Sequence, residues 1–156
     1  MSKIFDSQIK HYKEKFDSIR KELNANAIIA GAKSNGVTDE FLKAGLIENS
    51  EEFRLYCYKY AKTLMPGRVS CTTYAAVVSV LADHYGVEYN VCSGFCLPMS
   101  NEKYSSEKAA WEKRRSETSE EHPVFANHVF LKINDKYYEY FNGDTSNIDH
   151  IDCITI

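Results

Sequence analysis

Residues 71–85 constrain the fold most, because they predict a helix that is apolar over most of its circumference. Ser70 stands where an N-cap is expected, and Gly86 stands where a left-handed C-terminal stop is expected. The apolar positions between them cover a wide arc and consist of Tyr74, Ala75, Val77, Val78, Val80, Leu81, Ala82 and Tyr85. A helix of this kind has to lie at the centre of a domain, so the other elements must pack around it.

The sequence before this helix predicts further helices. Residues 5–23 carry apolar side chains at three- and four-residue steps, which is typical of an amphipathic helix. Residues 24–36 contain Gly, Asn and Ser and are interpreted as a loop around a short turn. Thr38 and Ser50 can each cap a following helix, the second of which runs to Leu64.

The sequence after this helix predicts an antiparallel sheet and one surface helix. Strands are expected at residues 89–97, 125–133 and 136–141, and a last strand at 148–156. Asn134-Asp135 is a hairpin signal between two of them. The polar segment 99–122 predicts an exposed charged helix around Trp111. Helices followed by antiparallel strands indicate an α+β fold, with the central helix packed on the sheet.

Composition and cysteine content exclude several classes of protein. The net charge of −3 gives no general attraction for nucleic acid or for an anionic membrane. The chain begins without an apolar signal-peptide core, and no stretch is long enough to span a bilayer. Five cysteines without repeated Cys-x-x-Cys pairs indicate reduced thiols and a cytoplasmic protein. Cys92 and Cys96 form a zinc-type pair that no second pair completes, so we expect no metal and no cofactor.

Cys71 is the candidate nucleophile, because it opens the central helix. The positive end of the helix dipole favours a thiolate over a thiol at this position. Among the five histidines only His128 opens an apolar strand that is followed by a hairpin, so it is the candidate proton acceptor and donor. The other four are His11 on a polar helix face, His84 in the last helical turn, His122 in a polar loop and His150 after the hairpin.

The same residues carry a resemblance to a known family. The run Cys71-Thr72-Thr73-Tyr74-Ala75, then Gly86-Val87, then Ser93-Gly94-Phe95, and then His128 with its hairpin, resembles the transglutaminase-like core of the papain-like superfamily. The resemblance covers residues 53–145, so residues 1–50 are interpreted as a helical N-terminal extension of a single domain spanning 1–156. It implies a papain-like, transglutaminase-like fold and a catalytic triad.

The third member of the triad has two candidates. Asn142 and Asp144 follow the second hairpin strand and lie two residues apart, on one face if the strand continues. The family usually carries Asp at this place, and papain-type proteases carry Asn. Either residue is expected to hold His128 in one tautomer.

Two parts of the site are less constrained by the sequence. The Cys71 backbone N–H is the natural first oxyanion donor, and Tyr58 and Tyr60 are weak candidates for the second. Residues 99–123 are expected to form a mobile cover over the cleft, with Trp111 docking on the tyrosine-rich hairpin.

The resemblance implies a hydrolase, a thiol protease, amidase or deamidase, that acts on a protein or peptide substrate through a thioester. Transamidation by a transglutaminase is the less favoured outcome. A transglutaminase-like binding module without catalysis is a second hypothesis. A third is a cell-wall endopeptidase, because Cys92-Ser93-Gly94-Phe95 resembles the signature of those enzymes. Against the third hypothesis, Pro98 does not allow a helix to follow Cys92.

Overall fold

Helix α5 (Cys71–His84) is the central element of the computed structural model, which describes residues 3–65, 67, 69–119, 121–145 and 147–156. Every side chain from Thr72 to Ala82 is buried. The Ser70 hydroxyl accepts a hydrogen bond from the Thr73 N–H, and Gly86 adopts the left-handed conformation that ends the helix. The predicted central helix and both of its boundary residues are confirmed.

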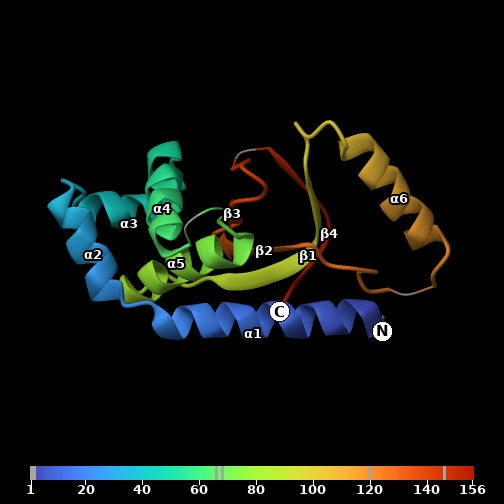
Figure 1. The fold of residues 1–156 in the computed structure, drawn as a ribbon, viewed down its shortest axis with the longest axis horizontal. Coiled ribbons are helices and arrows are strands. Elements are labelled where there is room, and N and C mark those ends of the chain that lie inside the picture. Colours follow the sequence, from blue (N-terminus) through green and yellow to red (C-terminus); the bar gives the residue numbers. More distant parts are fainter. Residues whose placement is uncertain (1–2, 66, 68, 120, 146) are drawn as a thin grey trace.

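Within the described residues, four helices precede α5. They are α1 (Lys3–Glu22), α2 (Ala25–Ser34), α3 (Asp39–Glu48) and α4 (Glu51–Leu64). Figure 1 shows α1 running along one side of the molecule beneath α5 and the sheet, and these helices cover α5 with apolar side chains. Thr38 and Ser50 cap α3 and α4 as predicted.

Helix α2 lies where the sequence was interpreted as a loop, and that interpretation is wrong. Asn24 acts as the N-cap, because its side-chain oxygen accepts hydrogen bonds from the backbone N–H groups of Asn26 and Ala27. Ile28, Ile29 and Ala32 are buried against the core. Tertiary packing of this short apolar face outweighs the low helix propensity of its Gly and Asn residues.

In the described part of the chain the sheet has four antiparallel strands in the order β3-β2-β1-β4. They are β1 (Asn90–Pro98), β2 (His128–Ile133), β3 (Lys136–Tyr138) and β4 (Ile148–Thr155). The chain is therefore α+β, with α5 packed against β2. The C-terminal strand β4 pairs with β1, so the sheet extends beyond residue 145.

Strands β1 and β4 approach each other closely at Gly94. A Cβ atom at this position would lie 2.2 Å from the backbone oxygen of Asp152 on β4. The pairing then shifts by one residue between Phe95 and Cys96, which places Cys96 opposite His150. Gly94 pairs with His128 on its other side, so this narrow place in the sheet adjoins the start of β2.

Helix α6 (Tyr104–Ser116) stands apart from the other helices, beyond β1 and β4 (Figure 1). It buries none of its residues fully, as expected for an exposed charged helix. The Trp111 ring stacks on Phe95 of β1, with the ring centres 5.8 Å apart and the planes inclined by 4°. No helix in the described part of the chain has the length and apolar character needed to cross a membrane.

Candidate active site

Cys71 lies at the first turn of α5 and lines a cavity of about 590 Å³. Its side chain is partly exposed, whereas Cys57, Cys92 and Cys96 are buried. Apolar side chains from β1, the segment before β2 and the segment after β3 form most of the cavity wall: Phe95, Leu97, Phe125 and Phe141. The predicted nucleophile is thus the cysteine that a substrate entering this cavity would meet.

His128 opens β2 behind Cys71. Its ring is fully buried between Phe130, with ring centres 5.5 Å apart, and Phe141, with ring centres 4.6 Å apart. Nε2 lies 2.9 Å from Oε1 of Glu139. The Cys71 thiol and the His128 imidazole lie close enough for each to shift the pKa of the other. The two residues expected to form the nucleophile and its proton carrier are therefore brought together.

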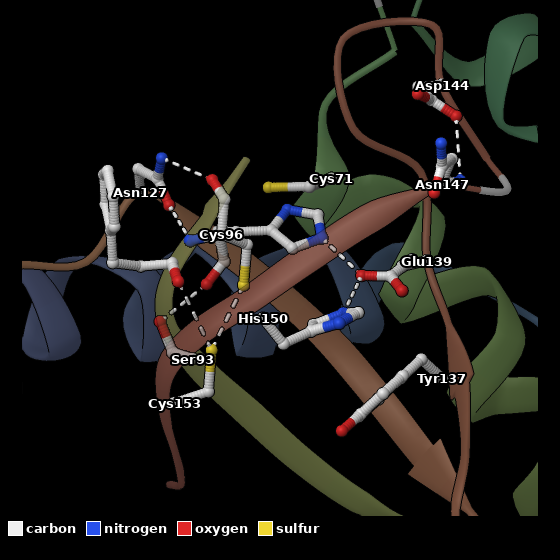
Figure 2. A network of polar contacts seen from close by, with 12 residues as sticks. Cys71, Ser93, Cys96, Asn127, Tyr137, Glu139, Asp144, Asn147, His150 and Cys153 are labelled. Atoms are coloured by element: carbon white, nitrogen blue, oxygen red, sulfur yellow. Dashed lines mark hydrogen bonds and ion pairs between the residues drawn. The ribbon is translucent and has the colours of Figure 1, made fainter. Parts of the chain in front are cut away.

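Glu139 is the carboxylate that the sequence analysis missed. It is buried, follows β3 directly, and uses the same oxygen, Oε1, to contact His128 and His150 (Figure 2). Continuing the hairpin register from Ile133 and Lys136 would place Glu139 opposite Phe130, on the face that carries His128. This count across the Asn134-Asp135 turn is the sequence signal that could have found it.

Neither Asn142 nor Asp144 takes the place that was predicted for it beside His128. Asn142 is exposed, has a φ of 48° and lines the cavity near Cys71. Asp144 accepts hydrogen bonds from the Ser100 hydroxyl and the Asn147 N–H. Glu139, and not Asn142 or Asp144, makes the contact with His128 that was expected of the third residue. The reason is that β3 ends at Tyr138, and the chain then turns at Asn142 and Gly143 instead of continuing extended.

The three groups shift one another's protonation. Burial would raise the pKa of the Cys71 thiol, but its interaction with His128 and the imidazolium charge outweigh burial and lower the pKa to about 7. Burial would likewise lower the pKa of His128, yet Cys71 and Glu139 raise it to about 9. Burial acts to raise the pKa of Glu139, and hydrogen bonds from His128 and His150 lower it overall. These shifts together favour a thiolate, an imidazolium and a carboxylate at the site.

The candidate oxyanion donors differ in their position relative to the cavity at Cys71. The Cys71 N–H belongs to the first turn of α5, where backbone donors have no partner within the helix. Tyr58 stacks on Tyr140, with ring centres 4.7 Å apart, and Tyr60 lines a separate cavity beside α2. Neither tyrosine lines the cavity at Cys71, so the expectation of a second donor from Tyr58 or Tyr60 finds no support in this geometry.

Of the remaining cysteines, Cys57 is buried in α4 and the other three lie in the sheet. Cys92 is within β1, and burial raises its pKa. The sulfurs of Cys96 and Cys153 are 3.1 Å apart between β1 and β4. Within the described residues no group of three or more His, Cys, Asp or Glu side chains is arranged to hold a metal ion.

Helix α6 contributes Glu107 and Ala110 to the cavity wall, so part of the segment 99–123 does cover the site. Trp111 packs on Phe95 of β1, and the expected docking on the tyrosine-rich hairpin is wrong. Tyr138 instead lies in the core and donates a hydrogen bond to the Leu46 carbonyl. The aromatic alternation of the hairpin reflects packing, and Phe141 at its end is the ring that reaches the cavity.

Cys71 at the cavity wall, with His128 and Glu139 buried behind it, thus forms a chain of thiol, imidazole and carboxylate. Such a set can generate a nucleophile and return a proton to a leaving group. Comparisons with protein-family models, with curated proteins and with solved structures found no match to this chain.

Proposed function

We propose that the protein is a cytoplasmic cysteine hydrolase with a transglutaminase-like, papain-like fold that cleaves peptide or carboxamide bonds through a thioester. The observation that carries the proposal is the Cys71–His128–Glu139 arrangement at a cavity. The order of the three groups and their charge states are those that nucleophilic catalysis by cysteine needs. The substrate class is a protein or peptide, with no role for nucleic acid.

In the proposed reaction the Cys71 thiolate attacks the carbonyl carbon and forms a C–S bond. The carbonyl electron pair moves to oxygen, and the Cys71 N–H at the start of α5 is placed to stabilise it. The C–N bond then breaks, and the proton on Nδ1 of His128 passes to the departing amine or ammonia. Glu139 holds Nε2 and keeps the ring in the tautomer and orientation this transfer requires.

The second half returns the enzyme to its starting state. His128, now neutral, takes a proton from water, and the hydroxide attacks the thioester carbon. The C–S bond breaks, the carboxylic acid leaves, and the Cys71 thiolate faces an imidazolium again. We favour water as the acceptor because nothing among the described residues of the cavity lining marks a second site for an amine.

The binding-module alternative rests on one observation, the complete burial of His128. A buried imidazole reaches the leaving group only through the cavity wall beside Cys71, whereas a structural histidine needs no access at all. The endopeptidase alternative fits the geometry poorly, because Cys92 is buried within β1 and its thiol pKa is raised by burial.

The test is labelling with a thiol-directed acyl probe, a peptide acyloxymethyl ketone, followed by peptide mapping. We expect the probe on Cys71, and loss of labelling in Cys71→Ala with retention in Cys92→Ala. Labelling of Cys92 would support the endopeptidase. A folded protein that takes no probe and cleaves no member of a fluorogenic peptide library would support the binding module.

A further inference from the structure

His150 is a second imidazole on the carboxylate of the candidate site. Its Nε2 lies 2.8 Å from Oε1 of Glu139, the same oxygen that contacts His128 at 2.9 Å. We propose that His150 is a positioning residue that holds Glu139 in place for His128. The inference rests on the proposed function, since it extends the triad by one residue.

The chemistry of the contact fixes the direction of the hydrogen bond. An ionised carboxylate only accepts, so Nε2 of His150 must carry the hydrogen. Glu139 is buried, and an ionised carboxylate without donors is costly in such a place. Two N–H donors on one oxygen keep this carboxylate charged and aimed at His128.

The surroundings of His150 hold its ring in a fixed orientation. The side chain is 11% exposed, and it stacks on Tyr137 of β3 with ring centres 3.8 Å apart and planes inclined by 25°. Phe130 of β2 packs on it at 4.9 Å between ring centres. The bulge in the pairing of β1 and β4 sets His150 opposite Cys96, so the backbone also fixes the position from which the ring projects.

Ionisable groups from several elements lie around this ring. Glu139 lies on one side, and the Cys96 thiol of β1 is opposite in the sheet. The neighbouring Asp149 carboxylate is held by the Tyr104 hydroxyl and the Lys108 ammonium of α6, so its charge is partly balanced. The closest charge partner of His150 is therefore Glu139.

Removing one hydrogen-bond donor from Glu139 should make the thiolate of Cys71 less favoured. Without the His150 N–H, the buried carboxylate keeps only His128 of its two histidine donors and is held less firmly beside that ring. The imidazolium is then less stabilised, and the thiolate that depends on it is less favoured. The reactivity of the Cys71 sulfur therefore reports on His150 through Glu139 and His128.

Two substitutions separate the donor from the packing. His150→Phe keeps an aromatic ring to stack on Tyr137 and removes the N–H, while His150→Gln keeps an amide N–H near the position of Nε2 and removes the ring. His84→Phe is the control, because His84 is an exposed histidine in the last turn of α5. The rate of Cys71 alkylation by iodoacetamide is measured against pH by peptide mass spectrometry.

We expect the alkylation of the unaltered protein to rise around pH 7. In His150→Phe the rise should move to about pH 8, a loss of about tenfold in reactivity at pH 6. His150→Gln should lie close to the unaltered protein, and so should His84→Phe. Nitrogen-15 spectra of the imidazoles should show doubly protonated His128 at pH 8 in the unaltered protein and less of it in His150→Phe.

Several results would overturn the inference. One is an unchanged profile in His150→Phe, and another is equal shifts in the Phe and Gln variants, which would indicate packing alone. A downward shift would show that His150 competes with His128 for Glu139. Failure of the proposed function is distinguishable, because alkylation and nitrogen-15 spectra need no turnover: an inactive protein with the expected shifts keeps the positioning role and loses only the reaction.

Discussion

At the residue scale, the site depends on two ionisations that shift in opposite directions. The thiol pKa of Cys71 falls from 9.0 to about 7, and the pKa of His128 rises from 6.5 to about 9. Each charged group stabilises the other, with Glu139 behind the imidazole. The helix start that the sequence predicts for Cys71 is confirmed.

We expect kcat/KM to follow a bell with limbs near pH 7 and pH 9. The same two pKa shifts affect the stability of the fold. Because the pKa of Cys71 is depressed, its contribution to the free energy of unfolding is present above pH 9 and is lost as pH falls through about 7. Because the pKa of His128 is raised, its contribution to the free energy of unfolding is present below pH 6.5 and is lost as pH rises through about 9. A fluorogenic peptide assay across this range checks the limbs. His128→Asn should move the Cys71 alkylation limb toward pH 9, and a limb that stays near pH 7 would contradict the pairing.

Glu139→Gln should lower kcat/KM by about 100-fold or more, because an amide gives His128 a weaker partner and allows the wrong tautomer. The matched control is Asp144→Asn, which changes the same type of group at a residue that contacts Ser100. This variant should keep turnover close to that of the unaltered protein. If Asp144→Asn were the damaging change and Glu139→Gln the mild one, Glu139 would not be the third member of the triad. Steady-state kinetics at pH 8 decides between them.

At the element scale, the hairpin shows what could and could not be predicted from sequence. The strands around Asn134-Asp135 follow from alternation and a turn signal, and both turn residues have the positive φ that such a hairpin needs. The end of the second strand does not follow, because Tyr140 and Phe141 are as apolar as the residues before them. The strand was predicted to end too late, so the orienting residue was expected at Asn142 or Asp144 and Glu139 was missed.

Gly94→Ala should destabilise the protein by about 3 kcal/mol or more, since the added methyl meets the backbone of β4, which cannot rotate away. Gly31→Ala is the control. Gly31 lies inside helix α2, and a methyl group added there would have no heavy atom of a neighbour within 4 Å, so alanine should stabilise by about 0.5–1 kcal/mol. Urea unfolding followed by circular dichroism measures both. Equal stabilities for the two variants would mean that β1 and β4 can separate at Gly94 without cost.

At the scale of the whole molecule, the helices-then-sheet order was predictable because each element carries its own period and its own caps. The relation between distant elements was not. Residues 148–156 carry no sequence signal that places β4 beside β1. Residues 3–22 likewise carry none that places α1 along α5. Such pairings depend on the register at Gly94 and on core packing, which one sequence does not reveal. His150 was set aside for the same reason.

The pairing of β4 with β1 has a consequence for the order in which the proposed site is assembled during synthesis. A ribosome that has made residues 1–145 has already produced Cys71, His128 and Glu139, yet the nascent chain still lacks the strand that covers the edge of β1 and carries His150. The segment that carries β4 therefore completes the surroundings of the proposed site only after its three groups have been made. A partly synthesised chain holds a cysteine without its full set of supporting groups, so a reactive thiolate should arise only after the sheet has closed.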